Sequence, residues 1–257
     1  MRVCVLGSGS KGNATWVATE KTRLLVDAGF SRREVFARLA SIGESPETCT
    51  AILISHEHTD HIAGLQKVAA EIGCSVYING ATRNAIPWGA KLARCDIFTT
   101  GQKFCVGEIE VSPFSIPHDT ADPVAFTLEV EGIKISVVTD LGYITSLVKE
   151  RVRGSNGLIF ESNHDLEMLK IGPYPWHIKQ RVMSRQGHLS NLTTADFLSE
   201  EYDGTAQVLV LAHLSETNNH PEIARLSAQQ ALAQRAHPTS SELHLASQSH
   251  PTRFFCW

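Results

Sequence analysis

The sequence of 257 residues lacks any long hydrophobic run. No stretch reaches the roughly 18 apolar residues that a membrane-spanning helix needs. The apolar run near the N-terminus, Val3 to Leu6, is too short for the core of a signal peptide. We therefore expect a cytoplasmic protein that makes no membrane contact.

Clustered cysteines and an excess of positive charge are also missing. The six cysteines are scattered, with no C-x-x-C pair or other short spacing typical of a zinc knuckle, so free thiols in a reducing compartment are expected. Lys and Arg number 23 against 27 Asp and Glu, a net charge of −4. This charge excludes a molecule that is basic as a whole.

No Pro/Ser-rich linker or change of composition divides the chain, so we expect a single domain over residues 1–257. Hydrophobic residues at 42% and charged residues at 19% are typical of an ordinary globular protein. Hairpin-like neighbours, such as the two strands that meet at Gly132, alternate with longer helical connections. This mixture predicts an α/β (α+β) protein with mixed sheets.

Short β-branched runs alternate with amphipathic segments along the whole length. The runs predict strands at 3–6, 15–18, 23–26, 51–54, 75–78, 109–116, 124–130, 133–138, 158–160 and 207–211. The amphipathic segments predict helices at 32–40, 62–71, 144–150, 177–184, 194–200 and 221–234.

Residues 7–12, GSGSKG, match the G-x-G-x-x-G pattern of dinucleotide-binding proteins, and Asp27 lies 20 residues beyond Gly7. That pattern needs a helix directly after the glycines, whereas residues 13–19, NATWVAT, favour a strand. A glycine-rich turn is the better interpretation, followed by a hairpin in which residues 20–22 turn the chain into the strand that ends at Asp27. No nicotinamide cofactor is expected.

The chain is rich in histidine, with 12 residues, and the clearest motif is SHEHTDH at 55–61, directly after the apolar run AILI. Side chains alternate in an extended segment, so His56 and His58 point to the same side and can hold one ion. Asp60 and His61 begin the next helix, where they can reach a second ion. An isolated histidine would be interpreted as structural, but H-x-H-x-D-H at a strand-to-helix junction predicts a metal site.

Further candidate ligands, His118, Asp140 and His213, stand at the ends of other apolar runs, where open sheets assemble their sites. Five imidazoles and two carboxylates suit two zinc ions, or manganese or iron, better than calcium or magnesium. Two such ions would outweigh the two carboxylates in charge. An anionic substrate and a displacement at phosphorus are therefore favoured.

At these positions the sequence resembles the metallo-β-lactamase superfamily, whose fold is a four-layer αββα sandwich of two mixed β-sheets with a dinuclear site at one edge. The resemblance implies a first metal on three histidines, a second on three further side chains, and one bridging carboxylate: His56, His58 and His118; Asp60, His61 and His213; and Asp140. It also implies that Asp27, in LLVDAG, supports the metal-binding loop from outside the ligand set. The alternative for Asp27 is a strand-end residue that caps a turn.

Longer sequence segments resemble one subgroup of this superfamily. They are SGSKGN (8–13), ESNHDLEML (161–169), GPYPWHIKQRVMSRQGHLSN (172–191), LAHLSETNN (211–219) and LASQSHPT (245–252). These strings are similar to the YycJ/WalJ subgroup, phosphodiesterase-like relatives of tRNase Z associated with DNA exonuclease activity. The cysteine ligand of the commonest zinc β-lactamases is absent.

The resemblance further implies a proton donor. His188 matches the histidine that protonates the leaving oxygen in tRNase Z, and Glu161 matches the glutamate that orients it. An imidazole suits this role because its pKa lies near 6.5. We count His188, Glu161 and Asp60 as catalytic residues. The alternatives are that His188 caps the following helix and that Glu161 is a surface acid.

The segment 170–188 has four cationic residues and no acidic one, with two aromatic residues interleaved. Such a segment can bind phosphates and stack an unpaired base, although a solvated helix face has the same composition. Asn163 and His164 either contact the substrate or turn the chain. The candidate substrate contacts are Lys179, Arg181, Arg185, Asn163 and His164.

These features together predict a dinuclear metal phosphodiesterase acting on nucleic acid, a 5′-to-3′ exonuclease with DNA favoured over RNA. A metal-bound hydroxide is the expected nucleophile and His188 the general acid. One alternative is a hydrolase of small esters, thioesters or lactones on the same fold, and another is a nucleotide-binding module with a vestigial metal site. The choice among the three metals stays open, as does the oligomeric state, for which a homodimer is one option.

Overall fold

Two seven-stranded sheets form the centre of the molecule in the computed structural model, which describes residues 1–88 and 91–257. The first sheet contains, in spatial order, β14 (Phe255–Cys256), β1 (Arg2–Gly7), β2 (Ala14–Ala18), β3 (Arg23–Val26), β4 (Ala51–Leu53), β5 (Ser75–Asn79) and β6 (Cys95–Phe98). The second contains β13 (Glu242–Leu245), β12 (Val208–Ala212), β11 (Gly157–Glu161), β10 (Ile133–Val138), β9 (Val124–Val130), β8 (Ile109–Ser115) and β7 (Phe104–Val106).

Both sheets are mixed. In the first, the pairs from β14 to β3 are antiparallel and those from β3 to β6 are parallel. In the second, the pairs from β7 to β10 are antiparallel and those from β10 to β13 are parallel. The parallel pairs bring the carboxyl ends of β3, β4, β10, β11 and β12 to the same edge of the two sheets.

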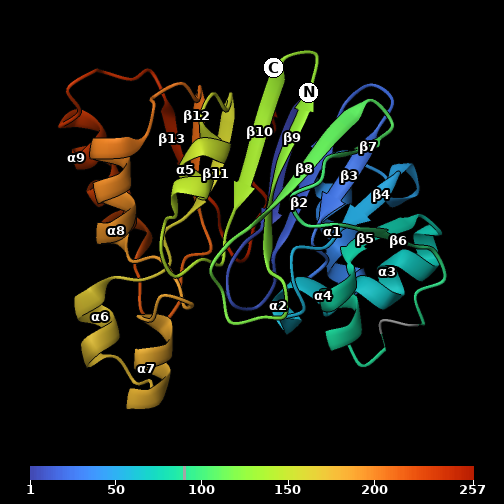
Figure 1. Ribbon diagram of the computed structural model, residues 1–257, viewed down its shortest axis with the longest axis horizontal. Coiled ribbons are helices and arrows are strands. Elements are labelled where there is room, and N and C mark those ends of the chain that lie inside the picture. The colour runs from blue at the N-terminus through green and yellow to red at the C-terminus, as the bar shows by residue number, and fades with distance from the viewer. Residues whose placement is uncertain (89–90) are drawn as a thin grey trace.

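Helices cover the outer face of each sheet (Figure 1). Helices α1 (Arg32–Ser41) and α3 (Leu65–Ile72) pack on the first sheet, and α5 (Ser146–Val152), α8 (Asn191–Asp196) and α9 (Pro221–Ala233) pack on the second. The shorter helical segments are a 3-10 turn (Pro46–Thr48), α2 (Thr59–Ile62), α4 (Gly80–Ala85), α6 (Leu166–Ile171), α7 (Trp176–Val182) and a π-helical turn (Phe197–Glu201).

The main core lies between the two sheets because alternate residues of each strand face inward. Val3 and Val5 of β1 belong to the same buried cluster as Phe126 and Leu128 of β9. Two further clusters of buried residues lie outside this core, one between the first sheet and its helices and one between the second sheet and its helices. The predicted four-layer sandwich of two mixed sheets is therefore confirmed.

Most of the predicted elements are present, three strands with the predicted bounds. The predicted helix 62–71 is wrong in one respect, because it is interrupted between α2 and α3. Gly64 at this break donates its N–H to Ala28 O at 2.9 Å, and a Cβ there would lie 1.9 Å from Phe30 O. Six short elements were not predicted: the helices α4 and α6 and the edge strands β6, β7, β13 and β14.

The glycine-rich segment is a turn, as predicted, and joins the antiparallel strands β1 and β2, with Cys4 opposite Trp16. The predicted hairpin across residues 20–22 is also present, as the antiparallel pair of β2 and β3. Gly9 and Gly12 have φ angles of 148° and 155°, and Gly12 N–H donates to Gly9 O at 3.0 Å. A side chain at Gly12 would also meet the ring of Phe30, with Cβ only 2.7 Å from a ring carbon. The turn therefore depends on glycine for conformation and for space.

The two chain ends lie together at the edge opposite α2 (Figure 1). Met1 donates its amino group to Trp257 O at 2.9 Å, and Trp257 N–H donates to Met1 O at 2.9 Å. The loops that carry the predicted metal ligands are at the other edge, near α2. Among the described residues, no helix is both long enough and apolar enough to cross a membrane.

Candidate metal centre

Three histidines meet where β4 and β8 end. His56 and His58 follow β4 and lie on the same side, as the alternation rule predicts, with ring centroids 4.9 Å apart. His118 follows β8, and its Nε2 lies 3.2 Å from His58 Nδ1. One ring nitrogen from each residue lies within 4.8 Å of the others. These three residues, His56, His58 and His118, are called the first group.

The second group consists of Asp60, His61, Asp140 and His213, whose ligand atoms also lie within 4.8 Å of one another. Asp60 and His61 lie in α2, Asp140 follows β10, and His213 follows β12. His61 Nε2 is 3.2 Å from Asp140 Oδ2, and His213 Nε2 is 3.4 Å from Asp60 Oδ2.

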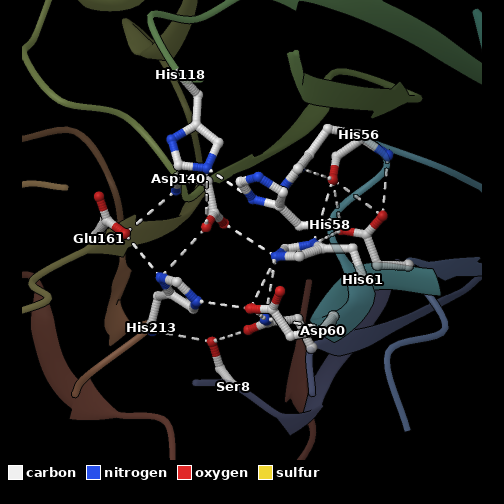
Figure 2. Close-up of polar contacts among 12 residues, drawn as sticks. Ser8, His56, His58, Asp60, His61, His118, Asp140, Glu161 and His213 are labelled. Atoms are coloured by element: carbon white, nitrogen blue, oxygen red, sulfur yellow. Dashed lines mark hydrogen bonds and ion pairs between the residues drawn. The ribbon is translucent and has the colours of Figure 1, made fainter. Parts of the chain in front are cut away.

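Asp140 is the member of the second group that lies next to the first group (Figure 2). Its Oδ2 faces His61 of the second group, whereas its Oδ1 lies 3.9 Å from His118 Nε2 of the first. The structure thus brings together all seven residues that the sequence analysis named as metal ligands. The position of Asp140 fits a carboxylate that is shared between two ions.

Backbone strain is concentrated at this site. Asp27, Asp140 and His213 have φ angles of 61°, 64° and 56°, and the only other described non-glycine residue with positive φ is Glu131, in the β9–β10 turn. Each such conformation costs on the order of 1–3 kcal/mol and persists where the surroundings impose it. The strained residues are where β3, β10 and β12 deliver their side chains to the site.

Four of the five histidines have a hydrogen-bond partner for the ring nitrogen that points away from the cluster. Such partners fix the tautomer and leave the other nitrogen as the metal ligand. The pairs are His56 Nδ1 with Ser55 Oγ at 3.0 Å, His61 Nδ1 with Asp27 Oδ2 at 2.8 Å, His118 Nδ1 with Gly187 O at 3.1 Å, and His213 Nδ1 with Glu161 Oε1 at 2.8 Å.

Asp27 connects two parts of the metal-binding loop. Its Oδ1 accepts hydrogen bonds from Ser55 N–H at 2.9 Å and from Ser55 Oγ at 3.0 Å, and its Oδ2 faces His61. The carboxylate is buried. These contacts support the role that the resemblance implies for Asp27, since it holds both the start of the loop and one of its histidines.

The two groups differ in their electrostatics. In the first group, burial lowers the pKa of His56, His58 and His118, so their rings stay neutral with a free lone pair. In the second group, burial opposes protonation of His213, but Asp140 and other carboxylates outweigh it and raise its pKa to about 10. The pKa of His61 is raised in the same way.

The residues present fit divalent metal ions. His56 Nε2 is buried and has no hydrogen-bond partner among the described residues, although a buried imidazole nitrogen normally has one. In the second group, the protons on His61 and His213 offset the carboxylates, and a divalent ion can replace these protons. The donor set of imidazoles and carboxylates suits zinc, manganese or iron.

His188 and Glu161 lie beside the second group. His188 Nδ1 is 2.9 Å from Glu161 Oε1, whose carboxylate also accepts from Leu141 N–H at 3.2 Å and Leu189 N–H at 3.0 Å. Glu161 is completely buried, so it is not a surface acid, and Ser190 rather than His188 caps α8. Both structural alternatives for this pair are therefore excluded.

Glu161 stays ionised despite its burial. Burial would raise its pKa, but the adjacent His188 and His213 lower it to about 2. Glu161 and His188 also lie within ligand distance of Asp140 and His213, so these four side chains could hold an ion by geometry alone. The hydrogen bonds that Glu161 already accepts favour its role as a partner of the two histidines.

The basic segment forms an arm, α6 and α7, that projects beside the site (Figure 1). Its cations are already partly engaged: Lys179 is buried and donates to Lys170 O at 2.6 Å, and Arg181 forms an ion pair with Asp119. The guanidinium of Arg185 lies 4.2 Å from the centre of the Tyr143 ring. Substrate contact by Lys179, Arg181 and Arg185 stays a prediction.

Asn163 and His164 are both buried. Asn163 Nδ2 donates to His213 O at 2.7 Å and so holds the strained backbone of that residue. Neither ring nitrogen of His164 has a hydrogen-bond partner among the described residues, and burial lowers its pKa to about 4. Their contact with substrate also stays a prediction.

Several residues of the site were not predicted. Ser8 Oγ accepts from His213 N–H at 2.9 Å, and Asn13 Nδ2 lies 3.3 Å from Asp60 Oδ2. Ser8 lies within the glycine-rich segment 7–12, and Asn13 directly follows it. The presence of such a turn in a chain with a metal motif was the only sequence signal for these two residues. Asp119 was also missed, although it directly follows a predicted ligand.

With this geometry established, comparison with known proteins identifies the family. The family described as "Beta-lactamase superfamily domain" matches residues 22–199. Exodeoxyribonuclease YycJ from Bacillus anthracis is 37% identical over 97% of this chain and 96% of its own length. The chain belongs to the metallo-β-lactamase superfamily.

Two further comparisons agree with this membership. Exodeoxyribonuclease WalJ from Streptococcus pneumoniae serotype 2 is 36% identical over 90% of this chain and 87% of its own length. The metallo-β-lactamase fold protein YhfI from Bacillus subtilis shares the fold with a TM-score of 0.75 at 20% identity, covering 98% of both chains. The predicted superfamily, its YycJ/WalJ relatives and the class of enzyme, a metallo-β-lactamase-fold hydrolase, are confirmed.

Proposed function

We propose that this chain is a metal-dependent phosphodiesterase that uses two divalent ions and degrades DNA as a 5′-to-3′ exonuclease. The observation that carries the proposal is His188, held 2.9 Å from the buried Glu161 at the rim of two adjoining groups of metal-ligand side chains. The relatives that share 36–37% identity are named exodeoxyribonucleases, which supports DNA over RNA.

The two groups provide the ligands for two ions. His56, His58 and His118 would hold the first, Asp60, His61 and His213 the second, and Asp140 would contact both. Ions held there would supply positive charge at the phosphodiester and lower the pKa of a bound water, the chemistry that hydrolysis needs. Zinc is the ion that we expect, and manganese or iron would suit the same donors.

His188 is placed to move a proton. Its Nδ1–H donates to Glu161 Oε1, so Nε2 is the atom that gives a proton to the leaving oxygen. The depressed pKa of Glu161 keeps its carboxylate negatively charged at neutral pH, so it accepts the hydrogen bond that orients the His188 ring. The same oxygen fixes the ring of His213 at 2.8 Å, so one carboxylate orients both residues.

The arm formed by α6 and α7 supports a nucleic-acid substrate. Trp176 at the start of α7 is 63% exposed, a position suited to stacking on an unpaired base. Arg185 lies at the other end of the arm, close to the loop that follows Asp140, since a Cβ on Gly142 would lie 2.3 Å from the Arg185 backbone. A small neutral ester or lactone needs neither feature.

A degradation time course tests the proposal. DNA and RNA with a 5′-phosphate and a label at either end are incubated with protein loaded with Zn²⁺ or Mn²⁺, and His188→Ala serves as the matched inactive control. We expect stepwise release of nucleotides from the 5′ end of DNA and slower loss of RNA. Hydrolysis of lactones or thioesters with both nucleic acids left intact would establish the small-molecule alternative instead.

A further inference from the structure

His58 differs from the other four histidines of the metal centre. Those four have a hydrogen-bond partner within 3.1 Å of the ring nitrogen that points away from the cluster. The corresponding Nε2 of His58 faces Asp119 Oδ1 at 3.7 Å, which is longer than a hydrogen bond. In the first group, therefore, the His58 ring lies near the Asp119 carboxylate but forms no hydrogen bond with it.

Asp119 is held in this position by the arm. Its second oxygen, Oδ2, pairs with Nε of Arg181 in α7. Its first oxygen lies 3.6 Å from His118 Nε2 as well as 3.7 Å from His58 Nε2. The loop around it is fixed, since His118 precedes it and Ala121 N–H donates to Glu57 Oε1 at 2.7 Å.

We propose that Asp119 is a positioning residue for His58 and that Arg181 holds it back until a phosphate binds to the guanidinium. A carboxylate on the outer nitrogen of a ligand histidine fixes the ring and makes it a stronger donor to the metal. A shift of about 0.5–1 Å, within reach of a side-chain rotation, brings Asp119 Oδ1 to hydrogen-bond distance of His58 Nε2.

The phosphate source in this proposal is the nucleic-acid substrate, so this half of it rests on the proposed function. The Arg181 side chain is 52% exposed, and a guanidinium binds phosphate in the same bidentate manner as carboxylate. A phosphodiester can therefore compete with Asp119 for Arg181. Substrate binding on the arm and metal binding in the first group would then strengthen each other, because such coupling is reciprocal.

The simpler reading is a surface ion pair with no link to the metal. A surface pair of this kind contributes little to stability and would leave metal affinity unchanged when either partner is replaced. The two hypotheses predict different metal affinities when Arg181 is replaced, because its removal leaves Asp119 free to reach His58. Our proposal predicts tighter metal binding in that variant, and the simple ion pair predicts no change.

The test measures the two metal-binding steps of the metal-free protein by competition of Zn²⁺ with a chromophoric chelator, without substrate. Arg181→Gln is expected to strengthen one step by about 10- to 100-fold, the usual effect of an engaged outer partner, and to leave the other step unchanged. The double variant Asp119→Asn/Arg181→Gln should lose this gain, because it has no carboxylate to reach His58. Asp119→Asn alone should bind Zn²⁺ about as tightly as the unmodified protein, in which Arg181 holds Asp119 back.

Lys170→Gln is the matched control, because Lys170 is another cation of the arm and pairs with Glu167 at 2.7 Å on the surface. It should change neither step. Thermal unfolding of the metal-free variants verifies that each is folded. The role of Asp119 is overturned if the double variant binds Zn²⁺ as tightly as Arg181→Gln, and the restraining role of Arg181 is overturned if Arg181→Gln leaves both steps unchanged or weakens one.

The link to substrate is tested by repeating the Zn²⁺ titration with a single-stranded oligodeoxynucleotide whose phosphorothioate linkages resist cleavage. It should strengthen the affected step in the unmodified protein and not in Asp119→Asn or Arg181→Gln. If the oligonucleotide binds without changing metal affinity, the coupling is wrong although the nuclease proposal stands. If it does not bind at all, the proposed nucleic-acid function is contradicted, whereas the substrate-free result for Asp119 is unaffected.

Discussion

Glu161 Oε1 lies 2.9 Å from His188 Nδ1, inside the protein, with the carboxylate completely buried. The same oxygen is 2.8 Å from His213 Nδ1. A proton-donating histidine and a metal-ligand histidine therefore share one partner. Substitutions at Glu161 should affect both functions, whereas substitutions at His188 should affect only one.

His188→Ala should keep both metal ions and slow turnover by about 10²–10⁴, the range for loss of a general acid. Glu161→Gln should slow turnover too, and should also weaken the second metal step by about 10- to 100-fold because His213 loses its charged partner. Metal content by elemental analysis and rates on labelled DNA separate the two variants. Loss of metal in His188→Ala would make His188 a ligand and remove its assignment as proton donor.

Metal binding should release protons at pH 7. Burial opposes the charge on His213, but the carboxylates around it raise its pKa to about 10, and the pKa of His61 is also raised. Both rings therefore carry a proton at pH 7 when no metal is bound, and a metal ion binds only the neutral ring. The apparent affinity should rise as the pH increases from 7 toward 10 and fall as the solution is acidified.

Calorimetry in two buffers of different ionisation enthalpy measures this release. We expect at least two protons per chain at pH 7 when both sites fill, one from each raised histidine, and up to one more from a water that the ions ionise. The first group should add none, because burial lowers the pKa of His56 and His118 and these rings are already neutral. A release near zero would show that His61 and His213 are neutral in the metal-free protein.

The fold was largely predictable because, in most strands, the residues with a high β-propensity and apolar side chains are also the residues that are buried. β3 and β10 have the predicted bounds, since their β-branched and apolar residues coincide with burial. The break at Gly64 was not predictable, because it arises from the backbone of Phe30, distant in sequence. β14 was missed for a similar reason: two residues become a strand only by pairing with the start of β1.

The metal-ligand residues could be predicted because histidine and aspartate at strand ends are distinctive residue types in a distinctive place. Their supporting residues are ordinary serine, asparagine and aspartate, whose roles come from approach in space. Asn13 contacts Asp60 across 47 positions, and Ser8 contacts His213 across 205. A local sequence pattern cannot predict contacts between residues so far apart in the chain.

Gly29→Ala should damage the second group although Gly29 has no side chain there. A Cβ at Gly29 would lie 1.6 Å from Asp60 O and 2.6 Å from Asn13 N, so the start of α2 must move. We expect a loss of about 1–3 kcal/mol in the free energy of unfolding and weaker binding of one metal ion. Gly80→Ala is the control, since its Cβ would meet only Ile97 at 3.9 Å. Equal behaviour of the two variants in thermal unfolding and metal titration would contradict this expectation.

Trp176→Ala should weaken binding of single-stranded DNA more than removal of an exposed aliphatic side chain on the same arm does. The ring is 63% exposed at the first position of α7, where it has little to gain from packing and can stack on a base. Stacking on an aromatic ring contributes roughly 1–3 kcal/mol per base. Ile171→Ala provides the comparison on the same arm, because Ile171 is 84% exposed but offers no aromatic face. Fluorescence anisotropy of a labelled oligonucleotide with metal-free protein measures binding without cleavage. The expected result is a clear loss of affinity for Trp176→Ala and little change for Ile171→Ala, and similar losses in both would indicate a merely apolar contact.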